Sequence, residues 1–261
     1  MAEIIDGKEL AKKIRKELKK DVDKLKEKGV NPKLAVIMVG NDPGSTVYVR
    51  NKSKACEKVG IEFEEFLFEE NITEETLLET IEKLNKDDSV HGILLQCPVP
   101  KHIDVNKAFR TISPKKDVDG FRSDSLFQPA TPLGIMNYLD YCGFDFEGKE
   151  VMIIGRSDIV GKPLAKMMTD RDATVTLCHS HSKLSNHLYS SDLIVSAVGK
   201  AGFLNCYPIH VPVIDVGINF VDGKLVGDCY NTEGRNVTPV PGGVGPMTIA
   251  MLMNNCVETL R

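Results

Sequence analysis

The chain has 261 residues, of which 42% are hydrophobic and 27% are charged, and its formal net charge is −4. This composition is typical of a globular protein with one large domain or two modest ones. The charge offers no basic surface for a polyanion, so a small molecule is a better candidate ligand than nucleic acid. No apolar run approaches the roughly 20 residues that cross a bilayer, and the start of the chain lacks the features of a signal peptide. We therefore expect a cytoplasmic protein that binds neither nucleic acid nor membrane.

Apolar runs alternate with amphipathic ones along the chain. Strands are predicted at 34–39, 61–68, 92–95, 151–154, 173–178, 193–198 and 213–216, most of them with the composition of buried strands. Helices are predicted between them, at about 7–28, 45–58, 73–85, 103–112, 132–142, 161–170 and 246–260. This order predicts an α/β fold with parallel sheets.

Turn-forming residues at 113–120 interrupt the pattern and place a domain boundary there. We predict one domain of residues 1–120 together with the C-terminal helix 246–261, and a second domain of residues 121–245.

The helix predicted at 45–58 carries Tyr48 and Lys52, which are four residues apart and share one face. A lysine in a desolvated cleft loses its proton near neutral pH, so this pair is a candidate for proton chemistry. The alternative is an exposed, permanently charged lysine, and Lys54 and Lys58 on the same helix have that character.

The strand at 92–95 leads into Gln96 and Cys97, where ligands bind at the edge of an open α/β sheet. The Gln96 amide is suited to a polar heterocycle, or it caps backbone groups at the strand end. Asp117 and Asp119 follow in a turn, and either carboxylate is a candidate ligand group or a turn stabiliser.

The segment 151–163 has the pattern of a dinucleotide-binding turn. A buried strand ends at Gly155, Arg156 and Ser157 follow, and Gly161 opens the next helix, whose amides attract phosphate. Ser180 ends the next strand where an NAD site usually has an acid, and Arg156 is a cation for a 2′-phosphate, so NADP is favoured over NAD. The alternative is an ordinary α/β connection with a solvated arginine.

Two further sequence features bear on the site. Residues 238–248 contain three glycines and three prolines around the start of the last helix, either for close backbone approach to a ligand or as a rigid linker. The seven cysteines lack a Cys-x-x-Cys pair, and we expect buried, reduced thiols. Cys178, His179 and His181 lack the further ligands that zinc needs, so we predict no metal.

Taken together and in order, these motifs resemble those of the bifunctional methylenetetrahydrofolate dehydrogenase/methenyltetrahydrofolate cyclohydrolase family, called FolD. The resemblance runs nearly end to end through Tyr48-x-x-x-Lys52, Leu95-Gln96, 116–120, 131–134, 155–163, 215–219, 223–228 and 239–248. It implies an N-terminal α/β catalytic domain that binds folate and a Rossmann-type NADP-binding domain, which face a central cleft. It also implies a homodimer, with residues 173–178 as a candidate interface, that acts on tetrahydrofolate derivatives in one-carbon metabolism and purine biosynthesis.

The resemblance also implies roles for individual residues. Lys52 is the expected catalytic base, Gln96 tunes it, Tyr48 orients the pterin, and Asp119 binds the pterin ring. The other expected contacts to substrate are Leu95, Cys97, Pro241, Gly242, Gly243, Val244 and Gly245. The expected contacts to NADP are Gly155, Arg156, Ser157, Ser180 and Ile218. Among them, Ser180 is expected to contact the 2′-phosphate, and Ile218 is expected to lie near the nicotinamide.

The chain departs from the family pattern at two places. The segment 122–130 is shorter than usual, and residues 205–211 look compressed. A shortened rim after Asp119 leaves two alternatives open: a monofunctional dehydrogenase or cyclohydrolase, and an NADP- and folate-binding module with little turnover.

Overall fold

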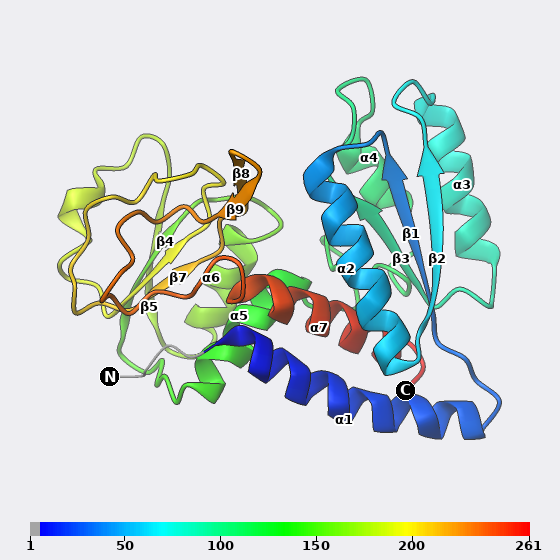
Figure 1. The fold of residues 1–261 in the computed structure, drawn as a ribbon, viewed down its shortest axis with the longest axis horizontal. Helices are drawn as coiled ribbons and strands as arrows, with labels where there is room; N and C mark the ends of the chain where they lie inside the picture. Colours follow the sequence, from blue (N-terminus) through cyan, green and yellow to red (C-terminus); the bar gives the residue numbers. More distant parts are fainter. Residues whose placement is uncertain (1–5) are drawn as a thin grey trace. The chain divides into compact units, whose positions relative to one another are not determined.

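The computed structural model describes residues 6–261, which form two compact units with parallel sheets (Figure 1). The first unit comprises residues 13–130 and Ile249–Arg261, and the second comprises residues 6–12 and Thr131–Thr248. The predicted two-domain α/β architecture is confirmed. Within residues 6–261, no helix is long and apolar enough to span a membrane.

The first unit contains a three-stranded parallel sheet in the order β2-β1-β3. Its strands are β1 (Lys33–Val39), β2 (Glu62–Phe68) and β3 (Gly92–Gln96), and its helices include α2 (Pro43–Val59), α3 (Glu74–Lys86) and α4 (Val105–Thr111). Because side chains alternate along a strand, Ala35, Ile37 and Val39 share one face of β1 and form a core with α3 and α4. The central strand is buried on both faces, which is typical of parallel sheets.

The second unit contains a four-stranded parallel sheet in the order β5-β4-β6-β7. Its strands are β4 (Glu150–Ile154), β5 (Thr174–Cys178), β6 (Leu193–Ser196) and β7 (Val213–Asp215), with helices α5 (Ala130–Tyr141) and α6 (Gly161–Thr169) and the short 3-10 helix η1 (Leu184–Asn186). All residues of β6 and β7 are buried. All four strands end at the same edge of the sheet, and loops that bind ligands in open α/β sheets follow that edge.

The hairpin of β8 (Asn219–Val221) and β9 (Lys224–Val226) was not predicted. Its turn is Asp222-Gly223, and both residues have positive φ, of 49° and 74°. An Asp-Gly pair between apolar residues is a strong signal for a tight hairpin turn, so the sequence did contain this information.

Two helices join the units along the chain. Helix α1 (Gly7–Glu27) begins in the second unit and continues in the first, and α7 (Val244–Glu258) does the same. The division at 130/131 differs from the predicted boundary at Gly120, because Arg122 and Ala130 are hydrogen-bonded to the first unit. The Arg122 N–H donates to Asp117 Oδ2 at 2.9 Å, and the Ala130 N–H donates to the Asp119 carbonyl at 3.2 Å.

The predictions of burial need correction at the sheet edges and at the cysteines. Strand β2 is only half-buried or exposed, and only the last residue of β5 is buried. Both are edge strands, and they lack the bridge to a further segment that β3 and β7 have through Ile93–Asp117 and Val213–Val237. All seven cysteines are free thiols, but only Cys56, Cys178 and Cys256 are buried, and Cys206 is exposed.

Candidate functional site

Helix α2 positions Tyr48 and Lys52 in the first unit. Its N-terminus is set by Asp42, whose carboxylate accepts the Ser45 N–H at 2.7 Å, and by Pro43 at the first helical position. Lys52 is 8% exposed, whereas Lys54 is exposed on another face of the helix. The alternative of a solvated surface lysine therefore does not hold for Lys52.

The ammonium group of Lys52 contacts the amide of Gln96 at the end of β3. Lys52 Nζ donates to Gln96 Oε1 at 2.8 Å, and Gln96 Nε2 donates to the Cys97 carbonyl at 2.8 Å. The second bond fixes the orientation of the amide, because its NH₂ group must face the carbonyl. Ser45 Oγ also donates to the Cys97 carbonyl, at 3.2 Å. Gln96 thus orients a buried lysine and also satisfies a backbone group.

Burial dominates the electrostatics around Lys52. It lowers the pKa of Lys52, and the nearby Asp119 carboxylate opposes this shift. Burial also raises the pKa of Asp119 to about 6, against the attraction of Lys52. The same cause raises the pKa of Cys56 to about 12 and that of Cys97 to about 11, so both thiols are neutral. Burial therefore favours the neutral amine of Lys52 over its ammonium form.

Tyr48 and Leu95 occupy different environments. Tyr48 is half-buried, and desolvation raises the pKa of its hydroxyl to about 12, which keeps it a proton donor. Leu95 is 2% exposed and belongs to the core cluster with α3 and α4. Only the backbone of Leu95 is therefore placed to contact a ligand.

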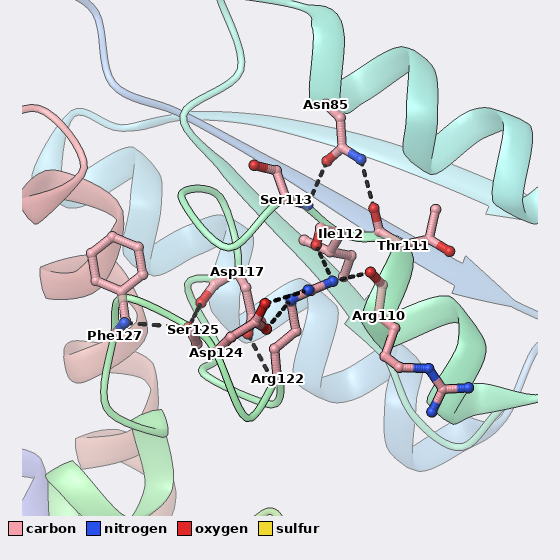
Figure 2. A network of polar contacts seen from close by, with 10 residues as sticks. All are labelled: Asn85, Arg110, Thr111, Ile112, Ser113, Asp117, Arg122, Asp124, Ser125 and Phe127. Carbon is pink, nitrogen blue, oxygen red and sulfur yellow. Dashed lines mark hydrogen bonds and ion pairs between the residues drawn. The ribbon is translucent and has the colours of Figure 1, made fainter.

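The segment after Asp119 is held by the polar network in Figure 2. The guanidinium of Arg122 donates from Nη1 to the carbonyls of Arg110 and Ile112 and forms an ion pair with Asp124. Asp117 accepts the Arg122 N–H, which is the turn-stabilising role considered for it. The short segment that follows Asp119 is thus tied through Arg122 to the end of α4.

In the second unit, Gly155, Arg156 and Ser157 form the turn between β4 and α6. A Cβ on Gly155 would lie 2.3 Å from the Ala197 carbonyl oxygen, and one on Gly161 would lie 1.9 Å from the Gly155 carbonyl oxygen. Both positions therefore require glycine. Within residues 6–261, the N–H groups of Arg156 and Ser157 have no hydrogen-bond partner. Free amides beside the N-terminus of a helix fit the pyrophosphate of a dinucleotide.

Arg156 and Ser180 lie at equivalent positions beyond two paired strands. Ile154 of β4 pairs with Cys178 of β5, and each of the two residues follows its strand by two positions. Both side chains are exposed, and Ser180 has a hydroxyl where an NAD site usually has an acidic side chain. The positions fit a ribose that carries a 2′-phosphate.

The remaining predicted residues also belong to the second unit. Ile218 is 44% exposed in the loop between β7 and β8, as expected for a contact to a ligand. Pro241 is exposed, whereas Gly242, Gly243 and Val244 are buried at the start of α7 and Gly245 is half-buried. A Cβ on Gly7 would lie 2.1 Å from the Gly243 carbonyl oxygen, so the backbone of this segment packs directly against the first residue of α1, which must be glycine.

Two buried carboxylates were not predicted as functional residues. Asp215 at the end of β7 is 2% exposed, and Asp228 after β9 is 0% exposed. Both accept several backbone N–H groups. Both lie in segments that resemble the family, 215–219 and 223–228, and each segment contains a glycine, Gly217 or Gly227, that indicated a close backbone approach. Residues 6–261 contain no cluster of three or more His, Cys, Asp or Glu that is arranged to hold a metal ion.

Comparison with protein families finds two matches that together span most of the chain. Residues 5–119 match the family described as "Tetrahydrofolate dehydrogenase/cyclohydrolase, catalytic domain". Residues 129–261 match "Tetrahydrofolate dehydrogenase/cyclohydrolase, NAD(P)-binding domain".

Individual relatives are similar over their whole length. The bifunctional protein FolD of Agathobacter rectalis is 49% identical over 278 residues, which cover 100% of both chains. FolD of Acetivibrio thermocellus is also 49% identical, over 100% of this chain and 97% of the relative.

Solved structures give the same result. FolD from Campylobacter jejuni has a TM-score of 0.93 at 46% identity and covers 97% of this chain and 96% of its own. The Trypanosoma brucei enzyme, complexed with NADP cofactor and inhibitor, has a TM-score of 0.93 at 35% identity and covers 99% and 97%.

Proposed function

Since the chain belongs to the tetrahydrofolate dehydrogenase/cyclohydrolase family, we propose that it oxidises 5,10-methylenetetrahydrofolate with NADP and hydrolyses the 5,10-methenyl product to 10-formyltetrahydrofolate. The observation that carries the proposal is the buried Lys52, whose Nζ lies 2.8 Å from Gln96 Oε1. A lysine with a lowered pKa is suited to act as a base in the hydrolytic step.

The second unit holds the cofactor in this proposal. Gly155 and Ser157 contribute the turn for the pyrophosphate, Arg156 and Ser180 bind the 2′-phosphate, and Ile218 contacts the nicotinamide. When bound, NADP supplies the acceptor for the hydride that leaves the methylene carbon of the substrate. The residues contribute orientation, which is a large part of the rate of such a transfer.

The first unit holds the folate and carries out the hydrolysis. Water attacks the cationic methenyl carbon, and the neutral amine of Lys52 accepts one proton from this water. The bond from that carbon to N5 then breaks as N5 takes the proton from Lys52, and the remaining proton of the added hydroxyl is released to water as the formyl C=O forms on N10. Gln96 Oε1 orients the amine without a full negative charge, and the substrate cation further disfavours a protonated Lys52.

The other residues orient the pterin in this proposal. Asp119, with a pKa of about 6, is largely ionised at neutral pH and accepts N–H groups of the ring. The Tyr48 hydroxyl remains protonated and orients the ring. Leu95 and Cys97 contribute backbone, and the segment from Pro241 to Gly245 contributes to the folate side.

We also propose that the protein is a cytoplasmic homodimer whose formyl product serves purine biosynthesis. The half-buried edge strand β5 supports residues 173–178 as the dimer contact. A mass measurement in solution tests the dimer, and a monomer would contradict it.

The experiment that tests the function supplies methylenetetrahydrofolate and NADP to the purified protein. Methenyl absorbance is expected to rise and then to decay. Absence of both would contradict the enzymatic proposal and favour a binding module. A rise without decay, or hydrolysis of supplied methenyltetrahydrofolate without oxidation, would contradict bifunctionality.

A further inference from the structure

The order of strands divides the cofactor edge of the second sheet into two halves. Arg156 and Ser180 follow the neighbouring strands β4 and β5. If the adenine half of NADP lies there, as in the proposed function on which this inference rests, the nicotinamide half extends over the ends of β6 and β7. The loops at those ends are residues 197–203 and 216–218.

Asp228 lies beneath both of these loops and accepts five hydrogen bonds. Its Oδ2 accepts Ser196 Oγ at 3.2 Å, the Val198 N–H at 2.7 Å and the Gly199 N–H at 3.1 Å. Its Oδ1 accepts the Lys200 N–H at 2.9 Å and Asn219 Nδ2 at 3.1 Å. The side chain is 0% exposed, so the donors replace its hydration entirely.

Three consecutive N–H groups that converge on one anion form a nest. Gly199 has a φ of +70°, the left-handed conformation that such a nest contains. A Cβ on Gly199 would contact nothing within 4 Å, so glycine is required here by its conformation rather than by space. Nests usually bind phosphate or another external anion. Here the anion is part of the chain, and these three amides are not offered to a ligand.

The same carboxylate couples the nest to the loop that carries Ile218. Asn219, which donates to Asp228, follows Ile218 directly. Asp215 Oδ1 accepts both the Gly217 N–H and the Asp228 N–H at 2.9 Å. A Cβ on Gly217 would lie 2.1 Å from Asp228 Oδ1, so the loop passes directly against the carboxylate. The two loops are thus fixed to a single buried group.

We infer that Asp228 is a positioning residue whose carboxylate fills the nest of residues 198–200 and holds this loop and Ile218 as a preformed surface for the nicotinamide half of the cofactor. Direct contacts to the adenine half come from other loops, those after β4 and β5. The loss of Asp228 is therefore expected to affect one half of the cofactor selectively.

Calorimetric titration with two ligands tests this selectivity. NADP probes both halves, and adenosine 2′,5′-bisphosphate, which lacks the nicotinamide, its ribose and its phosphate, probes only the adenine half. For Asp228→Asn, the Kd of NADP is expected to rise about tenfold, because an NH₂ group would face the amide donors. The Kd of adenosine 2′,5′-bisphosphate is expected to change less than about twofold.

A second variant keeps the test decisive if Asp228→Asn does not fold. Asn219→Ala leaves the carboxylate and its four other donors, and is expected to raise the Kd of NADP about threefold with the same selectivity. Met168→Ala, a buried residue of α6, is the control for general destabilisation of this unit. Equal weakening of both ligands in the folded variants, or unchanged NADP binding, would overturn the inference.

Chemical rescue provides an independent readout. In Asp228→Ala, formate at millimolar concentration is expected to enter the vacant nest and restore NADP affinity, whereas chloride at equal ionic strength is not. Failure of formate to improve NADP binding by a folded Asp228→Ala would count against the nest. If the wild-type protein binds neither ligand, the proposed function itself is contradicted. If it binds both ligands, the results for the variants test only the role of Asp228.

Discussion

Lys52 Nζ donates to Gln96 Oε1 at 2.8 Å, so a buried amine is paired with a neutral amide rather than with a carboxylate. An amide oxygen orients the amine but supplies no full charge to hold its proton. Burial therefore retains its effect and lowers the pKa of Lys52.

Gln96→Glu is expected to reverse this arrangement. A carboxylate at the same position favours the ammonium form and raises the pKa of Lys52 by about 1–3 units. In the proposed mechanism the base must be neutral, so the hydrolysis rate of methenyltetrahydrofolate is expected to rise with pH as Lys52 loses its proton. In the variant this rise is expected to move to higher pH by a similar amount. A pH–rate profile measures it, with the exposed Gln128→Glu as control. An unchanged profile would contradict the role of Gln96.

Asp119 has a predicted effect on stability of defined sign. Its pKa is raised to about 6 in the folded chain, above about 3.9 in the unfolded chain. The protonated carboxyl therefore contributes stability below about pH 4, which is lost as pH rises through about 6. For Asp119→Asn, the free energy of unfolding relative to wild type is expected to rise by on the order of 2 kcal/mol between about pH 4 and pH 7.

Urea unfolding at several pH values measures this difference. Asp124→Asn is the control with the opposite sign, because hydrogen bonds from Arg122 lower the pKa of Asp124. Asp124→Asn is therefore expected to lower the free energy of unfolding at neutral pH and to leave it unchanged at acidic pH. A pH-independent difference for Asp119→Asn would show that its carboxyl is not desolvated.

The proposed contacts of Arg156 and Ser180 to the 2′-phosphate predict the choice of cofactor. Arg156→Ala is expected to raise the KM for NADP about 10- to 100-fold. Ser180→Asp is expected to lower the preference for NADP over NAD further, because a carboxylate repels the 2′-phosphate and accepts hydrogen bonds from the ribose hydroxyls of NAD. Steady-state kinetics with both cofactors measure the ratio, and Lys162→Ala on α6 is the matched cationic control. Equal loss with NADP and NAD would place Arg156 elsewhere on the cofactor.

The network around Arg122 predicts the stability of the short segment after Asp119. Arg122→Met removes the donors to the Arg110 and Ile112 carbonyls, which is expected to lower the free energy of unfolding by about 2 kcal/mol. Arg110→Met is the control, since the Arg110 side chain is exposed and points away from the network in Figure 2. Thermal unfolding compares them, and equal effects would contradict the network.

Hydrophobic periodicity was sufficient to predict most of the fold. The helix expected at 45–58 and the strand expected at 151–154 occur as Pro43–Val59 and Glu150–Ile154, because long apolar patterns repeat with the period of the element. The hairpin of β8 and β9 was missed because each strand has three residues, too few for a period to be seen.

The environment of the candidate site could be predicted less well. Spacing places Tyr48 and Lys52 on one helix face but does not show what that face contacts, and the burial of Lys52 depends on the fold. The donors to Asp228 come from residues 196–219, which only folding brings to one carboxylate.

The most direct test of the account is the hydrolysis rate of methenyltetrahydrofolate by Lys52→Met compared with Lys54→Met. The two lysines are two residues apart on α2, but only Lys52 is buried beside Gln96. We expect Lys52→Met to lose about 10²- to 10⁴-fold in rate, the usual contribution of a general base, and Lys54→Met to match the wild type. A folded Lys52→Met protein that hydrolyses the substrate at the wild-type rate would contradict it.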